Sequence, residues 1–177
     1  MPRRPLMLLS LLTMAARGAG ADAVIPPFVG ETLAGNHIRL PSGIAQPTAV
    51  LIVGFTQKAA GQAERWGMEI GKLRACGKDQ PTEWYEMPVL SSIPRLVRPL
   101  VVRAIRSELG PELRAHFLPI YTEEASWKAA MGFSVPDDAY IAIVSGNGDL
   151  RFRLQGAFDL DKASRLKEQL QTACVQR

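Results

Sequence analysis

The residues best suited to chemistry in this chain are few and widely spaced. The sequence holds two cysteines, Cys76 and Cys174, and two histidines, His37 and His116. Two spacings let neighbouring side chains share a metal ion or exchange a disulfide: Cys-x-x-Cys and His-x-x-x-His. Neither occurs in this sequence. The sequence therefore predicts neither a metal site nor a cofactor site.

Hydrolase and nucleotide-binding signatures are also missing. The sequence contains no Gly-x-Ser-x-Gly nucleophile turn, no phosphate-binding loop and no paired carboxylates at catalytic spacing. The glycine-rich run Gly146-Asn147-Gly148-Asp149 lies between two extended segments, where Asn-Gly is typical of a hairpin turn. We interpret this run as a turn rather than as a cradle for phosphate.

The first residues predict export. Arg3 and Arg4 precede the uncharged run Leu6–Ala16, and Ala21-Asp22-Ala23 follows it. A positive start, a short apolar stretch and an Ala-x-Ala exit are the parts of a secretory signal peptide. As a helix the run would span about 16 Å, too short for the roughly 30 Å core of a bilayer. We expect a cleaved signal peptide over residues 1–23 and a periplasmic or secreted protein.

The rest of the chain, residues 24–177, suits one domain of common size. Three of the 21 basic and one of the 17 acidic residues lie in the predicted signal peptide, so the net charge falls from +4 to about +2 on cleavage. The remaining charge gives no reason to expect a nucleic-acid partner.

Extended and helical patterns alternate along this domain. Two short extended runs flank Gly35-Asn36, and Thr48 to Phe55 is apolar and rich in β-branched residues, as in a strand buried on both faces. Helical periodicity follows over 60–76 and over 93–109. Further strands are predicted over 84–90, 117–121, 140–144 and 150–154, and further helices over 123–131 and 161–174. This order predicts an α/β fold in three layers: a central mixed sheet with helices on both faces and a C-terminal hairpin plus helix. A split ferredoxin-like sheet is the main alternative.

The segment 93–109 combines an apolar stripe with a basic opposite side. Pro99 lies inside it and predicts a kink or a break. A basic amphipathic helix lies on an anionic membrane surface or meets an acidic partner, whereas a core-packed helix with a solvated basic face is the simpler alternative. The basic side chains are Arg95, Arg98, Arg103 and Arg106.

Two known groups of proteins resemble this sequence. Its opening run from Pro26 to Pro41 is similar to the first hairpin of exported thioredoxin-like and peroxiredoxin-like proteins. A longer stretch, roughly Phe28 to Leu170, resembles the assembly factor of the mitochondrial ATPase complex, a thioredoxin-like family that helps build the membrane sector. Ser145 departs from that family, which usually has an acidic residue there. The resemblance rests on Phe55, Trp66, His116-Phe117, Gly132-Phe133, Tyr140–Val144, Gly148–Phe152 and Gly156.

The resemblance implies a thioredoxin-like fold without thioredoxin chemistry. In thioredoxins the paired cysteines lie where the central strand meets the next helix. Counted from Phe55, that position holds Ala60-Gly61-Gln62-Ala63, so no thiolate is available for dithiol exchange. The family's loop proline is also displaced, since Ala139 takes its place and Pro136 lies three residues earlier.

The function implied is that of a non-catalytic binding or assembly factor, chaperone-like, for an envelope or membrane protein complex. A thiol-redox or peroxiredoxin-like enzyme with an atypical site is the alternative. A protein partner would bind near the start of the helix that follows the central strand, and peripheral contact with an anionic membrane is a second expectation. The candidate partner-binding residues are Gln57, Lys58, Gly61 and Gln62.

The resemblance also implies a disulfide. In a thioredoxin-like topology the helices that end at Cys76 and Cys174 run side by side on one face of the sheet, so their ends are neighbours. In an oxidising compartment two such cysteines are expected to pair, and two unrelated buried thiols are the alternative.

Overall fold

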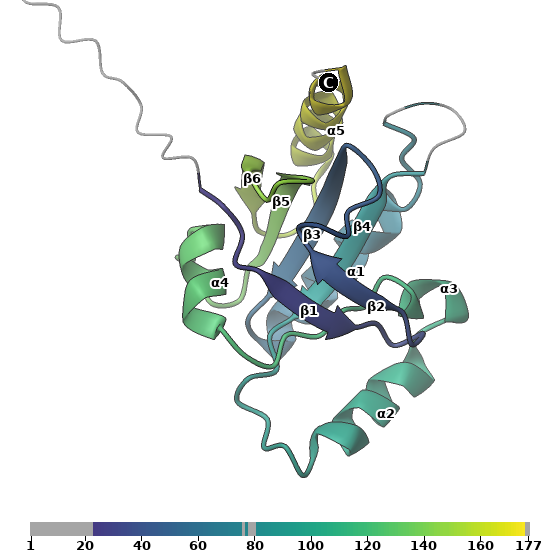
Figure 1. The fold of residues 1–177 in the computed structure, drawn as a ribbon, viewed down its shortest axis with the longest axis vertical. Helices are drawn as coiled ribbons and strands as arrows, with labels where there is room; N and C mark the ends of the chain where they lie inside the picture. The colour runs from purple at the N-terminus through teal and green to yellow at the C-terminus, as the bar shows by residue number, and fades with distance from the viewer. Residues whose placement is uncertain (1–22, 76, 78–80, 176–177) are drawn as a thin grey trace, which may run out of the picture.

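A computed structural model describes residues 23–75, 77 and 81–175 of the chain (Figure 1). A central mixed sheet carries helices on both faces, which confirms the predicted α/β layers. The predicted signal peptide lies, apart from Ala23, outside the described residues. None of the described helices is long and apolar enough to cross a bilayer.

The main sheet has four strands in the order β4-β3-β5-β6. The central strand β3 pairs in parallel with β4 and antiparallel with β5, and β6 completes the predicted C-terminal hairpin. Every residue of β3 and of β5 is buried, as their continuous apolar runs predict. The strands are β3 (Thr48–Gly54), β4 (Glu83–Pro88), β5 (Ala139–Ser145) and β6 (Leu150–Gln155).

Two long helices, α1 (Gln57–Ile70) and α5 (Leu160–Val175), cover one face of the sheet. Trp66 of α1 is fully buried between them and the sheet, and its indole Nε1 donates to the Gly156 carbonyl at 3.0 Å. The prediction placed the first of these helices over 60–76, but it ends at Ile70, six positions before Cys76 in the sequence, so the expectation that Cys76 ends this helix is wrong. It begins earlier because the Thr56 hydroxyl caps it, accepting from the backbone N–H of its first turn.

The other face carries the hairpin of β1 (Phe28–Glu31) and β2 (His37–Leu40), which lies in front of the sheet in Figure 1, together with α4 (Glu124–Met131) at the left of that view. Phe28 meets Trp127 of α4 edge to face, with ring centroids 6.0 Å apart. The predicted strand over 117–121 is only an extended segment, joined in parallel to β4 by isolated bridges.

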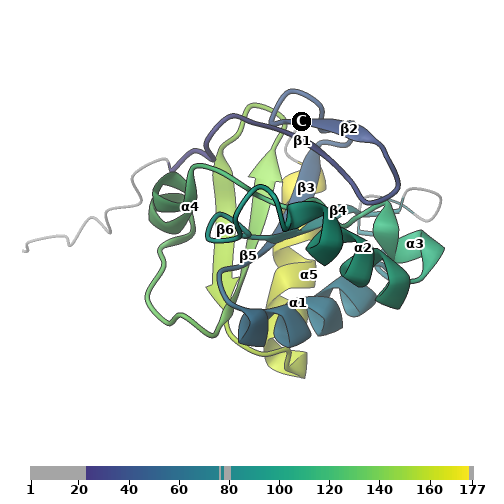
Figure 2. The same cartoon turned by 90° about the horizontal axis from the view of Figure 1, so that it is seen from below.

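The helices α2 (Arg98–Glu108) and α3 (Pro111–Arg114) stand apart at the β4 edge (Figure 2). The predicted helix over 93–109 starts five residues late because Pro99, which cannot donate to an inner helical turn, fits in the first turn.

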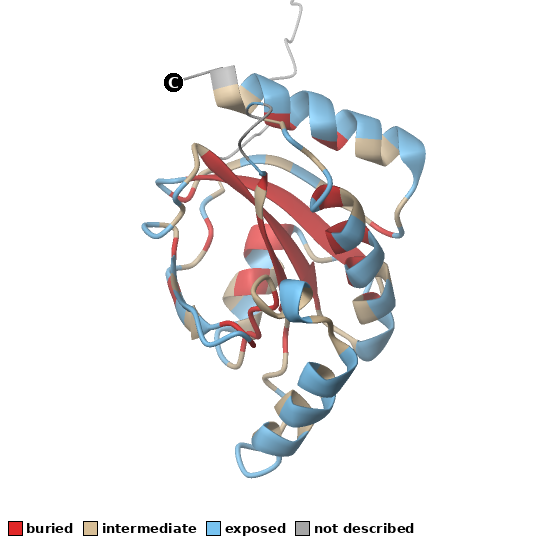
Figure 3. Cartoon of the chain, turned by 90° about the vertical axis from the view of Figure 1, so that its right-hand side faces the viewer, coloured by how far each residue is buried: buried red, intermediate tan, exposed pale blue. Residues whose placement is uncertain are grey.

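No residue of α2 is buried, so the alternative of a core-packed helix is wrong. Leu100 is 67% exposed, and Leu96, just before the helix, is 94% exposed. In Figure 3, α2 is the tan and pale-blue helix at the bottom of the molecule.

Candidate functional site

A cavity of about 690 Å³ opens where the parallel strands β3 and β4 end. We call it the carboxyl-end pocket. Gly54 and Pro88, the last residues of these strands, lie at its base. The first turns of α1 form one wall, and Val101 and Ile105 of α2 contribute to the other. In open α/β sheets, ligands bind outside the carboxyl ends of the strands, so the position suits a binding site.

The lining of this pocket is mostly apolar; Thr56, Gln57 and Ser92 are its neutral polar residues, and its charged residues all have one sign. Phe55, Leu90 and Ile93 are among its apolar residues. Its charged lining groups are all carboxylates, and no lysine, arginine or histidine is among the described residues that line it. This excess of acid occurs in a chain whose net charge is +4. The carboxylates are Glu64 of α1, Glu86 of β4 and Glu108 of α2.

Glu86 is the unusual member of this set. Its residue is only 9% exposed, and within the described part of the chain its carboxyl group makes neither a hydrogen bond nor an ion pair. Burial, and secondarily the negative charge of Glu64, raises the pKa of Glu86 to about 8. Burial disfavours the ionised form of this carboxyl group at the pocket wall, which makes Glu86 a candidate functional group.

The strand that carries Glu86 is held from its outer side. The Glu86 N–H donates to the His116 carbonyl at 2.9 Å, and the Leu118 N–H donates to the Glu86 carbonyl at 2.8 Å. The His116 ring stacks on Trp84 with centroids 4.2 Å apart. The backbone of Glu86 is therefore fixed between β3 and the segment 116–118. Its side chain points to the same face of β4 as Trp84, which is the face covered by α1.

The position expected for a redox pair lies within α1 beside this pocket. Because Thr56 caps the helix, Ala60 and Gly61 fall one turn after the helix start. Both line the pocket together with Gln57, whereas Ala63 is buried against the sheet. No cysteine or methionine is among the described residues that line the pocket, so its wall offers no sulfur.

Two of the four predicted partner-binding residues have contacts within the protein. Lys58 forms an ion pair with Asp137, 3.1 Å between Nζ and Oδ2, and the Thr56 hydroxyl donates to the other carboxylate oxygen at 3.0 Å. The Gln62 side chain donates to the Asp137 carbonyl at 3.0 Å and accepts from the Ala139 N–H at 3.1 Å. Lys58 and Gln62 therefore hold the loop before β5 against α1, and Gln57 and Gly61 face the pocket.

The four arginines predicted for one helix face do not form a single surface. Arg95 precedes α2, while Arg103 and Arg106 are exposed on the helix itself. Arg98 folds back: its Nε donates to the Ile93 carbonyl at 2.9 Å, and its guanidinium lies 4.7 Å from the centre of the Tyr121 ring.

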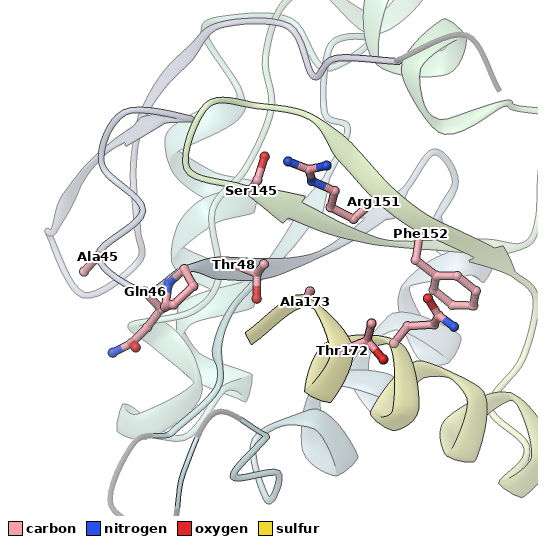
Figure 4. A pocket seen from close by; sticks show the side chains of 10 residues that line it. Ala45, Gln46, Thr48, Ser145, Arg151, Phe152, Thr172 and Ala173 are labelled. Carbon is pink, nitrogen blue, oxygen red and sulfur yellow. The ribbon is translucent and has the colours of Figure 1, made fainter. Parts of the chain in front are cut away.

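A second cavity, of about 730 Å³, lies at the opposite end of the sheet. We call it the amino-end pocket. Its lining includes Thr48, Ser145 and Arg151 of the strands and Thr172 near the end of α5, and the Arg151 guanidinium lies beside Ser145 in Figure 4. Arg151 is paired with Asp149 at 3.1 Å, and the buried Thr48 hydroxyl has no hydrogen-bond partner among the described residues. No pattern in the sequence predicted this cavity.

The predicted disulfide involves a residue outside the described part of the chain. Cys174 lies near the end of α5 and is not a free thiol. Its predicted partner, Cys76, is not described, so the pairing stays a prediction.

Glu64 and Glu86 were not among the residues predicted from the sequence to form a site. One signal was available for Glu86: it lies between Tyr85 and Met87 in a short strand whose other inner residues are large and apolar. A carboxylate in the middle of such a strand breaks the pattern, and a functional reason for it is worth seeking.

No protein-family model matches the chain, and no curated protein matches it. Solved structures do. The exposed lipoprotein thioredoxin of Streptococcus pneumoniae superposes with a TM-score of 0.56 at 11% identity, covering 81% of this chain and 98% of its own. Yeast Sco1 gives 0.57 at 16% identity over 86% and 96%. BsSco, of the Sco family of cytochrome c oxidase assembly proteins, gives 0.58 at 12% identity over 89% and 96%. The chain has a thioredoxin-like fold.

Proposed function

We propose that this chain is an exported, non-catalytic protein of thioredoxin-like fold that binds a partner protein at its carboxyl-end pocket. Its role would be that of an assembly factor for an envelope or membrane protein complex. One observation carries the proposal: the fold keeps an open pocket at its strand ends, while the adjoining helix has alanine at both positions expected for cysteine.

The chemistry left in the pocket suits binding better than catalysis. Thiol exchange begins with attack by a thiolate, and none can form at Ala60 or Ala63. What remains is a concave, mostly apolar surface with a small number of polar groups, which is the usual make-up of a recognition site. Gly61, exposed and with open space where a side chain would begin, lets a partner approach the helix closely.

The assembly role draws on two precedents. The sequence resembles the assembly factor of the mitochondrial ATPase complex, and the Sco family is described as assembling cytochrome c oxidase. Export draws on the predicted signal peptide, and one structural neighbour is an exposed lipoprotein. Both precedents concern other proteins, and we carry over to this chain only a role in assembling a protein complex.

The enzyme alternative is separated by activity. Purified protein is expected to be inert in insulin disulfide reduction and in peroxide turnover, with a thioredoxin and a peroxiredoxin as positive controls. Turnover abolished by Cys76→Ser or Cys174→Ser would replace the proposal with a redox function.

The binding role is tested by site-specific photo-crosslinking in living cells. A photoreactive residue at Gly61 is compared with one at Gly146, a glycine of the β5–β6 turn that is equally exposed and equally open around its Cα. Crosslinks from Gly61, but not from Gly146, to a subunit of one envelope complex are expected. Equal patterns from both positions would contradict a partner site at the carboxyl-end pocket.

A further inference from the structure

We propose that the carboxyl-end pocket receives a basic side chain, a lysine or an arginine, from the partner protein. The charged head would lie between Glu86 and Glu64, and the alkyl stem would lie along the apolar walls. This inference rests on the proposed function and deepens it, because it names the chemistry that the partner brings.

The acidic groups that line the carboxyl-end pocket favour a cationic ligand. Three elements that meet at this pocket, α1, β4 and α2, each contribute one carboxylate to its lining: Glu64, Glu86 and Glu108. No cation lines the pocket in the described part of the chain, so these charges are not balanced within it. Glu64 and Glu108 are exposed, and Glu86 loses its proton only near pH 8, so the attraction for a ligand of opposite sign is strongest above that pH.

The second step is the unpartnered carboxyl group. Glu86 is about nine-tenths buried, lines the pocket and has no hydrogen-bond partner among the described residues. Its oxygens are not among the fully buried side-chain atoms that lack a partner, so they remain accessible at the pocket and open to a group supplied from outside. An ammonium or guanidinium group provides hydrogen-bond donors and the opposite charge together.

The lining of the pocket favours an organic cation over a metal ion. In the part of the chain that the structure describes, no group of three or more histidine, cysteine, aspartate or glutamate side chains is placed to hold a metal. Between the carboxylates the walls are apolar, with Phe55, Val89 and Ile105 among them. Lysine and arginine combine an apolar stem with a charged head, which matches such a lining.

Binding of a cation is expected to depend on pH through Glu86. The titratable groups that line the pocket are Glu64 on α1, Glu86 on β4 and Glu108 on α2. Burial and the Glu64 charge keep the pKa of Glu86 at about 8, so near pH 7 most molecules must release its proton when a cation binds. Affinity should therefore rise with pH up to about 8 and level off above it.

The experiment follows backbone amide NMR signals of the mature protein during titration with n-butylguanidinium, with n-butylammonium and with the neutral n-butanol. Both cations are expected to shift the Gly61 and Val89 signals saturably at pH 8.5, and to bind several-fold more weakly at pH 6.5. Butanol is expected to be much weaker at both values. Cations that bind no better than butanol would overturn the inference.

Two substitutions locate the effect. Glu86→Gln is expected to weaken cation binding at least about tenfold at pH 8.5, because it removes a charge-assisted contact, and Glu64→Gln should weaken it less. The matched control is Glu69→Gln, also on α1, whose carboxylate pairs with Arg65 and Lys72 outside the pocket. Equal affinities for the Glu86→Gln and Glu69→Gln proteins would overturn the assignment.

Failure of this inference is distinguishable from failure of the proposed function. Crosslinks from Gly61 together with absent cation binding would keep the partner site and reject the basic side chain. Cation binding without crosslinks would reject the assembly role and keep the pocket's preference for a cation.

Discussion

The two ends of the sheet carry cavities of similar size and different chemistry. The amino-end pocket measures about 730 Å³ and the carboxyl-end pocket about 690 Å³. At the amino end, Arg151 is already paired with Asp149. At the carboxyl end, Glu86 is buried with no counter-charge among the described residues. The difference shows that volume alone does not distinguish the two cavities, whereas the chemistry of their lining residues does.

The walls of the carboxyl-end pocket differ as well. α1 buries five residues against the sheet, while α2 buries none. One wall is therefore part of the core, and the other is a helix held mainly by its ends and a few half-buried side chains. Local stability is expected to follow this difference, with α2 opening more easily than α1.

The largest expected effect concerns Glu86. Its carboxyl group binds a proton more tightly in the folded protein, where the pKa is raised from 4.5 to about 8, than in the unfolded chain. The stabilisation is therefore complete below about pH 4.5 and is lost as the pH rises to about 8, a fall of about 4 kcal/mol in the free energy of unfolding.

Glu86→Gln should remove this fall, so that the variant is the more stable protein at pH 9. Urea unfolding across the pH range measures it. Parallel profiles for the two proteins would contradict a desolvated carboxyl group at the carboxyl end of the sheet.

The next effect concerns the rigid wall. A Cβ at Gly67 of α1 would lie 2.7 Å from Cζ3 of the Trp84 ring, which is itself stacked on His116. Gly67→Ala is expected to lower the free energy of unfolding by about 1–3 kcal/mol. Gly61→Ala, on the same helix with open space around it, should raise it by about 0.5–1 kcal/mol. Thermal or urea unfolding compares the pair, and a harmless Gly67→Ala would mean that α1 is not tightly packed.

At the amino end the expected effect is smaller and of opposite sign. The Thr48 hydroxyl is buried without a partner among the described residues, so Thr48→Val should raise the free energy of unfolding by about 1 kcal/mol. Thr172→Val is the control, since that hydroxyl is exposed and donates to the Glu168 carbonyl at 3.0 Å. Destabilisation by Thr48→Val would show a hydrogen bond to the hydroxyl and weaken the contrast between the two ends.

The smallest effect is expected on α2. Leu100 is 67% exposed, so Leu100→Ala should change the free energy of unfolding by less than about 0.5 kcal/mol. Ile70→Ala on α1, where the side chain is 1% exposed, should cost about 2–5 kcal/mol. Similar losses in the two variants would mean that α2 is packed as firmly as α1.

Much of the fold could be predicted because its pattern is local. The continuous apolar run of β3, the Asn-Gly turn between β5 and β6 and the helical periodicity of α1 and α5 all appear in the sequence at their own positions. The start of α2 was misplaced because the apolar spacing before Pro99 continues a helical pattern that the proline ends.

The site could not be predicted in the same way. An apolar stripe shows that a helix has two sides, but whether the stripe is buried depends on a surface that the rest of the chain supplies or withholds, as for α2. Glu64 and Glu86 lie 22 positions apart in the sequence and face the same pocket only because α1 packs across β4. The sequence alone shows that cysteine is absent from the expected redox position. That the Glu86 carboxyl group lines a pocket could be established only from the three-dimensional structure.

Carbon-detected NMR titration of the Glu86 carboxyl group tests the account most directly. We expect a midpoint near pH 8 that moves down in Glu64→Gln and moves down further when n-butylguanidinium is added. A midpoint in the ordinary range of a solvated glutamate, between about pH 4 and 5, unmoved by the cation, would contradict it.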